Sequence, residues 1–337
     1  MKQLSNRTDG QNIRRVIVTG ATSMVGIALI KECIKHNVEV LAIVRKGSTK
    51  RKRIPKSGSV EIIEYDLKDL AGFTSERSGK IYDVCYHFAW SHTSKGMRDD
   101  PVLQQENIRY TLDAVEMASR LGCWKFVGAG SQAEYGSKKE IIDPDTYVEP
   151  QVAYGISKYA AGLLSQKLCR RYGMIHIWGR IFSVYGSNDK EETMLSYAIG
   201  QFIKGETAKF SSGVQMWDYL HEDDAGKIFY LLGERIMQDR VYCIASGKPR
   251  QLKKFILEMQ EVYGAGAECE FAKEDGQQVL QIQADASSLF RDISYMPVIS
   301  FKEGIKKMIN DKLKDVRGGA ELNIIKCRLL KKRLVAA

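Results

Sequence analysis

Short apolar runs and amphipathic stretches alternate along the first half of the chain. Six runs rich in β-forming residues predict strands, at residues 16–18, 38–44, 60–65, 84–89, 124–127 and 175–178. Most of them are separated by stretches with apolar residues at helical spacing, such as 107–121 and 154–172. Strands that alternate with helices build a parallel sheet with helices on both faces. The pattern therefore predicts a doubly wound α/β fold.

The regular alternation ends near Tyr185. Beyond it, the pattern predicts two polar helices and short strands, which are typical of a smaller substrate-binding lobe. Residues 223–235 and 241–245 predict one more helix and strand that return to the sheet. We therefore expect a sheet domain at 12–184 with 220–247 returning to it, a lobe at 185–219 and 248–317, and a basic amphipathic tail at 318–337.

Composition places the chain among globular enzymes. Its 337 residues are 44% apolar and 27% charged, which is ample material for a buried core. Residues 1–15 are polar and no apolar stretch approaches the length of a membrane span, so we expect a cytoplasmic protein. The seven cysteines are scattered without a C-x-x-C pair, which argues against a disulfide framework and a metal site.

The net charge of +10 is concentrated in two clusters, at 45–53 and at 326–333. Neither cluster has interleaved aromatic residues, so we expect no nucleic-acid partner. In the tail, Leu322, Ile325 and Leu329 can share a helix face with basic residues around them, which suits a membrane surface or a partner helix. We favour the alternative, an exposed helix or a frayed end.

A glycine turn directly follows the first predicted strand. Gly20 and Gly26 let the backbone pass close to phosphate oxygens, and the N–H groups of the following helix supply partial positive charge. A bare strand-to-helix turn is the alternative, because two glycines near a strand are a weak signal. We expect a dinucleotide here, bound by the loop residues between the glycines: Thr22, Ser23, Met24 and Val25.

Ligands of such sheets bind beyond the carboxyl ends of the strands. Arg45 and Lys46 end the second predicted strand, where an acidic residue would bind the 2′-hydroxyl of NAD and a basic one the 2′-phosphate of NADP. NADP is therefore the preferred cofactor, with NAD and a merely solvated basic loop as alternatives. Two further segments follow strands and are expected near the adenine and the nicotinamide ribose, respectively: Asp66-Leu67 and Phe88-Ala89-Trp90.

Tyr154 and Lys158 lie four residues apart at the start of a predicted helix, hence on one face. A phenol with a pKa near 10 is a poor base at neutral pH, so a nearby cation makes proton exchange with a substrate hydroxyl useful. A second Y-x-x-x-K copy at Tyr135 and Lys139 lies in a stretch where a helix is improbable. Ser131 follows the fifth strand at the same sheet edge and predicts a hydrogen bond to the reacting oxygen, with a turn-capping serine as the alternative.

Eight motifs follow one another along residues 14–310. They are the Gly20–Gly26 loop, Asp66-Leu67, His87-Phe88-Ala89, Asn107, Ser131 with Tyr135-Gly136, the Tyr154/Lys158 pair, Arg180-Ile181-Phe182-Ser183-Val184-Tyr185-Gly186, and Gln215-Met216-Trp217-Asp218-Tyr219-Leu220. In this order they resemble the extended branch of the short-chain dehydrogenase/reductases, the NAD(P)-dependent epimerase/dehydratase group that acts on nucleotide sugars.

The resemblance implies a Rossmann-type fold with a smaller C-terminal substrate-binding lobe. It implies that Tyr154 is the acid/base, that Lys158 binds the nicotinamide ribose and lowers the tyrosine pKa, and that Ser131 orients the sugar oxygen. Asn107 and Phe182 are implied as further cofactor contacts. The substrate is implied to be a nucleotide-diphosphate sugar, and the assembly a homodimer through the helices at 107–121 and 154–172.

Departures from the family pattern narrow the reaction. Gln132 and Ala133 stand where sugar 4,6-dehydratases carry Asp-Glu, so dehydration is not expected, and Glu134 is expected to point elsewhere. Trp217 stands where many epimerases have an arginine that grips the diphosphate. We expect a nucleotide-4-keto-sugar reductase with hydride transfer at a sugar carbon, commonly C4; a 4-epimerase, a reductase of a non-sugar ketone and a nonenzymatic dinucleotide sensor are the alternatives. Substrate contacts are expected from Trp90, Ser91, Gln132, Ser183, Asn188, Gln215 and Trp217.

Overall fold

The computed structural model describes residues 13–74, 79–94, 96–273 and 280–314. The chain divides into two compact units. Unit 1 comprises Met1–Val184, Gln215–Arg250 and Gln278–Val298, and unit 2 comprises Tyr185–Val214, Gln251–Gln277 and Ile299–Ala337. The tail expected at 318–337 lies outside the described residues.

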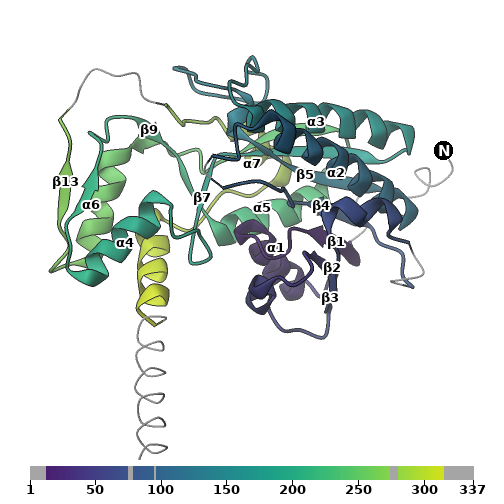
Figure 1. Cartoon of the computed structure of the whole chain (residues 1–337), viewed down its shortest axis with the longest axis horizontal. Helices are drawn as coiled ribbons and strands as arrows, with labels where there is room; N and C mark the ends of the chain where they lie inside the picture. The colour runs from purple at the N-terminus through teal and green to yellow at the C-terminus, as the bar shows by residue number, and fades with distance from the viewer. Residues whose placement is uncertain (1–12, 75–78, 95, 274–279, 315–337) are drawn as a thin grey trace, which may run out of the picture. The chain divides into compact units, whose positions relative to one another are not determined.

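Within the described residues, unit 1 is built on a seven-stranded parallel sheet (Figure 1). The strand order is β11-β6-β5-β4-β1-β2-β3. Its strands are β1 (Arg15–Thr19), β2 (Glu39–Val44), β3 (Val60–Glu64), β4 (Val84–His87), β5 (Lys125–Ser131), β6 (Ile175–Ile181) and β11 (Arg240–Ile244). The six predicted strands and the returning one are confirmed, and with them the doubly wound, Rossmann-type α/β fold.

Helices cover both faces of this sheet, α1 packing with α5 and α2 packing with α3 (Figure 1). Side chains alternate across each strand, so Val16 and Val18 of β1 share one core with Leu29 of α1, whereas Ile17 lies in a second core with Val115 of α2. The helices of unit 1 are α1 (Met24–Lys35), α2 (Pro101–Arg120), α3 (Ala153–Arg171), α5 (Glu222–Arg235) and α7 (Ser287–Ile293).

Helix α2 begins well before the predicted residue 107. Asp100 caps it, because its carboxylate accepts hydrogen bonds from the N–H groups of Val102 and Leu103 at 2.9 and 3.0 Å. Pro101 suits the first helical turn, where its missing N–H would have no helical partner. The Asp-Pro signal therefore sets the true start of the helix.

Strand β1 lies where the strand order reverses, between β4 and β2. In open α/β sheets the crevice beyond the carboxyl ends of the strands at such a switch point binds ligands. The strands β1, β2, β4 and β5 end there at Thr19, Val44, His87 and Ser131. The fold thus brings the residues that follow these four strands to one edge of the sheet.

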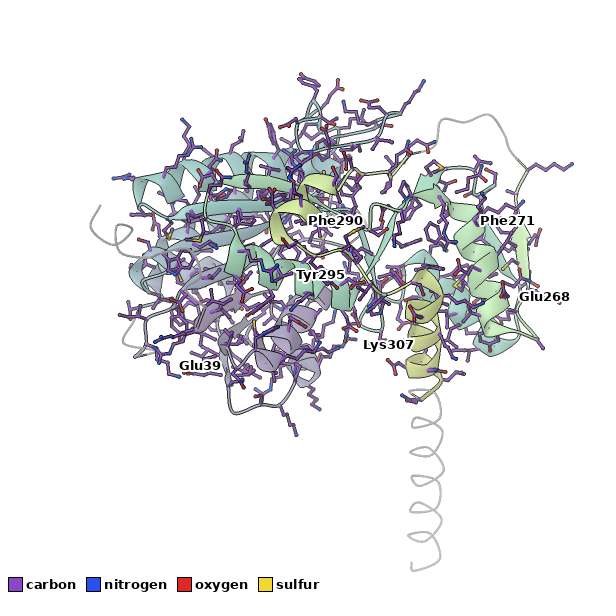
Figure 2. The ribbon with its side chains drawn as sticks, turned by 180° about the vertical axis from the view of Figure 1, so that it is seen from behind. Glu39, Glu268, Phe271, Phe290, Tyr295 and Lys307 are labelled. Atoms are coloured by element: carbon purple, nitrogen blue, oxygen red, sulfur yellow. The ribbon has the colours of Figure 1, made fainter. Side chains whose placement is uncertain are left out.

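Unit 2 has its own aromatic core. Phe202 lies 5.3 Å from Tyr263 between ring centroids, and Phe255 lies 4.7 Å from Phe301. Its elements are α4 (Met194–Lys204), α6 (Leu252–Tyr263), a helix at 301–314, and the parallel strands β8 (Ala208–Phe210) and β13 (Cys269–Phe271), the second of which carries the labelled Phe271 (Figure 2). The remaining short elements of the described residues are η1 (Thr49–Arg53), η2 (Leu67–Gly72), η4 (Gln132–Glu134), β7 (Ser183–Tyr185), β9 (Met216–Trp217), β10 (Tyr219–His221) and β12 (Arg250–Gln251).

In the part of the chain that the structure describes, no helix has both the length and the apolar character to cross a membrane. Across the same residues, no three His, Cys, Asp or Glu side chains gather as a metal site would require. Of the cysteines described, five are buried and Cys269 is half-buried, and all six are unpaired.

Candidate active site

Neither glycine of the turn after β1 has room for a side chain. Gly20 has a φ of +67°, and a Cβ there would lie 2.6 Å from the backbone nitrogen of Ala89. A Cβ on Gly26 would lie 2.5 Å from the carbonyl oxygen of Gly20. The turn therefore presses directly against the end of β4, and the helix N-terminus behind it faces the switch point. This backbone cradle fits the pyrophosphate of a dinucleotide.

Ser23 caps helix α1 in the middle of this turn. Its Oγ accepts a hydrogen bond from the Gly26 N–H at 3.1 Å, and its own N–H donates to the Gly20 carbonyl at 2.9 Å. Thr22 precedes this cap, and Met24 and Val25 form the first helical turn. The serine thus replaces the common middle glycine without breaking the turn, because its side chain supports the helix start.

At the end of β2, the two predicted basic residues have different surroundings. The Lys46 ammonium lies 3.1 Å from the Asp69 carboxylate, and the Lys46 N–H donates to Asp66 Oδ1 at 3.1 Å. The hydrogen bond to Asp69 raises the pKa of Lys46. Arg45 is exposed directly after the strand. Asp66 therefore shapes the loop behind β2, with Leu67 beginning η2, and Arg45 and Lys46 are both exposed.

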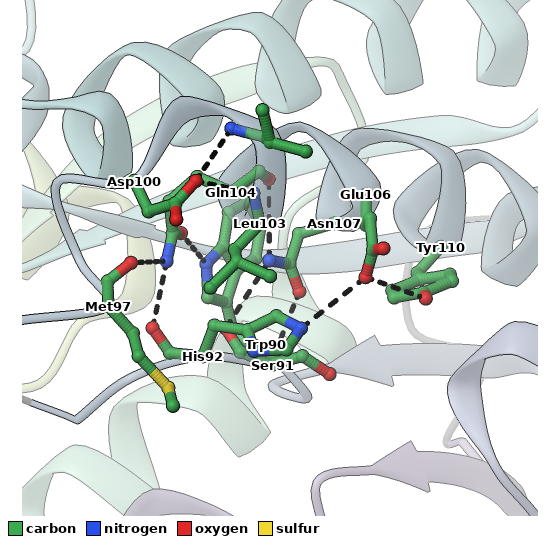
Figure 3. Close-up of polar contacts among 11 residues, drawn as sticks. Trp90, Ser91, His92, Met97, Asp100, Leu103, Gln104, Glu106, Asn107 and Tyr110 are labelled. Carbon is green, nitrogen blue, oxygen red and sulfur yellow. Dashed lines mark hydrogen bonds and ion pairs between the residues drawn. The ribbon is translucent and has the colours of Figure 1, made fainter.

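The segment after β4 is held by helix α2 (Figure 3). The Trp90 indole N–H donates to Gln104 Oε1 at 2.9 Å, and the Ser91 N–H donates to Asn107 Oδ1 at 2.7 Å. The Asn107 amide donates back to the Ser91 carbonyl at 3.3 Å. Phe88 packs edge-on against Phe229 at 4.8 Å. Asn107 thus acts on the segment that carries Trp90 and Ser91.

Ser131 is the last residue of β5 and caps the short helix η4. Its Oγ accepts a hydrogen bond from the Ala133 N–H at 3.2 Å, so the turn-capping interpretation describes one of its contacts. The same hydroxyl lies close enough to the Tyr154 phenol to lower the pKa of that phenol. Gln132, the next residue, is half-buried. Capping and contact with the phenol therefore coexist in one side chain.

Glu134 points toward β6, in line with the expectation that it does not take the place of a dehydratase carboxylate. Its Oε1 accepts hydrogen bonds from the Ser131 N–H at 2.8 Å and from the Trp178 indole at 3.0 Å, and its Oε2 lies 2.8 Å from Arg180 Nε. The side chain is completely buried. Ser131-x-x-Glu134 is the spacing of a capping box, which is the signal that could have revealed this residue. Glu134 therefore fixes the turn that presents Ser131.

Helix α3 starts without a capping side chain of its own at Val152. The Asp99 carboxylate accepts a hydrogen bond from the Ala153 N–H at 2.9 Å, and the Arg98 carbonyl accepts one from the Tyr154 N–H at 2.9 Å. The segment before α2 thus supplies acceptors that the first helical turn needs. It also fixes the position of Tyr154.

Lys158 lies one helical turn after Tyr154 and is buried. Its ammonium donates to the Ala129 carbonyl at 2.7 Å, lies 3.7 Å from the centroid of the Trp90 ring, and lies 5.9 Å from that of Tyr154. The structure therefore brings the three residues of the predicted constellation together, with Trp90 against both Tyr154 and Lys158.

Burial dominates the acid–base behaviour of this group. It raises the pKa of the Tyr154 phenol, and the charge of Arg98 and the hydrogen bond with Ser131 oppose this shift. It lowers the pKa of Lys158 to about 7, against the attraction of Glu134. Burial thus shifts the pKa of the phenol upward and that of the amine downward, so both groups favour their neutral forms.

The other expected substrate residues lie in different places. Ser183 begins β7 and Phe182 is buried against Tyr135. Gln215 Oε1 and the Trp217 indole N–H are buried, and neither has a hydrogen-bond partner among the described residues. Asn188 belongs to unit 2. The second Y-x-x-x-K copy is not helical, as predicted, and the Tyr135 hydroxyl contacts Cys243 Sγ at 3.4 Å.

Unit 2 contains a pocket that the sequence did not indicate. Its volume is about 310 Å³, near the lower end for small-molecule sites. Within its wall, Phe210 packs edge-on against Tyr197 at 6.4 Å and stacks on Phe271 at 5.6 Å. The lining residues are Glu192, Met194, Tyr197, Lys209, Phe210, Ser211, Leu252 and Ile256.

Comparison with known proteins gives a consistent picture. A UDP-glucuronate 4-epimerase from Thermodesulfobacterium geofontis is 23% identical over 310 residues, covering 87% of this chain and 94% of the relative. The structure of UDP-N-acetylglucosamine 4-epimerase from Methanobrevibacter ruminantium matches with a TM-score of 0.81 at 21% identity, over 90% of this chain and 100% of the other. The UDP-glucose 4-epimerase of Thermotoga maritima matches with a TM-score of 0.79 at 19% identity, over 90% and 99%.

The family model of the NAD dependent epimerase/dehydratase family matches residues 16–245, more than half of the chain. That range begins in β1 and ends just after β11, and so contains the glycine turn, Ser131 and the Tyr154/Lys158 pair. The resemblance found in the sequence is confirmed, and this chain is an enzyme that belongs to the NAD dependent epimerase/dehydratase family.

Proposed function

We propose that this chain is a nucleotide-sugar 4-epimerase with Tyr154 as its acid/base. The observation that carries the proposal is the convergence of Ser131, Tyr154 and Lys158 beside Trp90 at the carboxyl edge of the sheet. When bound, the nicotinamide of the cofactor would supply hydride acceptance and return. The three 4-epimerases compared above support the epimerase outcome over the reductase that the sequence favoured.

In this mechanism the chain's own residues move one proton. The Tyr154 phenolate removes the proton of the sugar 4-hydroxyl while the C4–H bond breaks, and Ser131 donates a hydrogen bond to the carbonyl oxygen that forms. On return, Tyr154 gives the proton back to that oxygen. Lys158, held by the Ala129 carbonyl, places its amino group one helical turn from the phenol and supplies positive charge there when it is protonated. Glu134 is committed to Arg180 and Ser131, and the positions used in dehydratases hold Gln132 and Ala133, so elimination of water is not proposed.

The test uses a panel of UDP-hexoses and UDP-uronic acids with purified protein. An epimerase converts one C4 epimer into the other, seen by NMR, without net change of cofactor absorbance at 340 nm. Tyr154→Phe is expected to abolish conversion, while Tyr172→Phe, at the other end of the same helix, keeps it. Full conversion by Tyr154→Phe would refute the assignment.

A nucleotide-4-keto-sugar reductase is the second candidate, favoured by the exposed Arg45 after β2. We infer that Arg45 accommodates the 2′-phosphate of NADP, which a net reductase would consume. The similar UDP-glucuronic acid 4-epimerase of Bacillus cereus was solved in complex with NAD. Comparison of NADP and NAD affinities in the wild type and in Arg45→Gln tests this. Arg53→Gln, in the same basic cluster, is the control. An unchanged affinity ratio in Arg45→Gln would leave NAD as the cofactor.

We infer that the pocket of unit 2 binds a nucleoside base. Phe210 offers an aromatic surface, while Lys209, Glu192 and Ser211 contribute polar atoms to the lining. Phe210→Ala is expected to weaken UDP binding about tenfold by calorimetry, a loss typical of one stacking contact. Phe290→Ala, in unit 1, should leave it unchanged.

We also propose a homodimer through α2 and α3. Val102 on α2 and Ile156, Leu163 and Leu164 on α3 are large apolar residues exposed to solvent in the single chain. Ile156→Lys combined with Leu163→Glu is expected to give monomers in sedimentation velocity. Leu257→Glu, an equally exposed position on α6, should not change the sedimentation coefficient.

A further inference from the structure

Arg98 stands over the ring of Tyr154. Its guanidinium carbon lies 4.1 Å from the ring centroid, nearer than the Lys158 ammonium at 5.9 Å. A cation over an aromatic face stabilises electron density in the ring, and a phenolate delocalises its charge there. We propose that Arg98 is a positioning residue for the reaction, which stabilises the Tyr154 phenolate from the face of the ring. This inference rests on the proposed role of Tyr154 as acid/base.

The backbone around Arg98 is anchored on both sides, so the position of its side chain is not accidental. Before it, the Met97 carbonyl accepts a hydrogen bond from the Gln104 amide at 2.9 Å (Figure 3). The Arg98 carbonyl accepts the Tyr154 N–H, and Asp99 accepts the Ala153 N–H. The segment at 98–99 therefore supplies hydrogen-bond acceptors to the start of helix α3. It also places the Arg98 guanidinium over the ring of Tyr154, the second residue of that helix.

The carboxylates next to Arg98 are engaged with helix N-termini. Asp99 binds the start of α3, and Asp100 binds the N–H groups of Val102 and Leu103 at the start of α2. They face backbone donors, and the guanidinium faces the phenol ring. Its charge is therefore available to Tyr154.

Several charged or hydrogen-bonding groups face Tyr154 from the surrounding elements. The Ser131 hydroxyl at the end of β5 lowers the pKa of the phenol, and Glu134 in η4 is paired with Arg180. Lys158 in α3 has a pKa of about 7, so its charge falls as the pH rises through neutrality. A guanidinium remains charged throughout this range. Arg98 thus adds a guanidinium at the ring face of the phenol, apart from the Lys158 amine.

The experiment measures the Tyr154 phenol directly in the full-length protein, with neither cofactor nor substrate. Tyrosine labelled with ¹³C at the ζ position is titrated by NMR, and the Tyr154 signal is assigned by its loss in Tyr154→Phe. Arg98→Gln is expected to make the phenol about tenfold weaker as an acid, a shift typical of losing one nearby opposite charge. Arg98→Lys should retain most of the wild-type value. Arg171→Gln, an exposed arginine at the far end of α3, is the control and should change nothing.

An unchanged Tyr154 pKa in Arg98→Gln would overturn the inference, whatever substrate the enzyme proves to use. A shifted pKa together with full turnover by Tyr154→Phe would instead refute the proposed function and leave this electrostatic contact standing. Where turnover is measured, Arg98→Gln should lose about tenfold in kcat at pH 7 and approach the wild type at high pH. A loss that is equal at every pH would indicate a purely structural role and would also overturn the inference.

Discussion

Two lysines, Lys125 and Lys158, are both buried with a lowered pKa, but only Lys158 lies close to the Tyr154 phenol. Lys125 begins β5 and donates to the carbonyls of Leu232 and Gly233 at the end of α5. Lys158 donates to the Ala129 carbonyl in the second half of the same strand. Burial lowers the pKa of both ammonium groups to about 7. By burial and pKa alone, neither would be singled out as functional.

The remaining contacts separate the two sites. Each ammonium lies over an indole, at 4.5 Å for Lys125 on Trp124 and at 3.7 Å for Lys158 on Trp90. Each also has a carboxylate that favours its charged form, Glu234 and Glu134 respectively. Lys158 alone has a phenol one turn away, at the strand ends where this fold binds ligands. A perturbed pKa therefore reports burial, and the chemistry follows from what the buried group faces.

Replacing each lysine by methionine gives the largest expected contrast. Lys158→Met should lower the turnover proposed above about a thousandfold, within the range for loss of acid–base assistance. Lys125→Met should keep kcat near the wild-type value, because it lies at the opposite end of β5. Initial rates at pH 7, with folding verified by circular dichroism, provide the measurement. Comparable losses in both variants would mean that the contrast between the sites is wrong.

Replacing Glu134, the carboxylate near Lys158, should have the next largest effect, a loss of folding stability. Glu134→Gln leaves the buried Arg180 without its counter-charge, so we expect the free energy of unfolding to fall by about 3 kcal/mol. Glu64→Gln removes the partner of the exposed Arg51 and should cost well under about 1 kcal/mol. Urea unfolding measures both. Equal losses would show that the buried pair contributes no more than a surface ion pair.

The sequence predicted some of these features and missed others for physical reasons. The strands were predictable because β-forming runs are local, and Tyr154 with Lys158 because four residues make one helical turn. The burial of Lys125 was not predictable, since its acceptors on α5 lie more than a hundred residues away. Arg98 was missed for the same reason: its contact with Tyr154 exists only when the segment before α2 meets the start of α3.

The pH dependence of stability should report Lys125. The folded-state pKa lies near 7, below the ordinary value of 10.5, so the unfolded chain binds more protons between these limits. Stability therefore rises with pH from 7 upward, by at most about 1.4 kcal/mol per pH unit for one such lysine. In Lys125→Met, the free energy of unfolding should therefore rise less steeply with pH than in the wild type. Urea unfolding from pH 7 to 8.5 measures the difference between variant and wild type, and parallel curves would show that Lys125 is not a neutralised buried amine.

The smallest expected effect concerns the indoles. The Trp90 ring favours the charged form of Lys158, so Trp90→Leu should lower its pKa further, by about 0.7 unit for a contact of about 1 kcal/mol. Trp90→Phe keeps an aromatic face and should restore most of the value. Trp124→Leu should shift Lys125 by less, because that ammonium lies 4.5 Å from its ring rather than 3.7 Å. NMR titration of lysine labelled with ¹³C at the ε position measures each amine. If Trp90→Leu and Trp90→Phe gave Lys158 the same pKa, the indole would act only by excluding water. The indoles would then not distinguish Lys158 from Lys125, and the difference between the two sites would lie in the other groups that face each lysine.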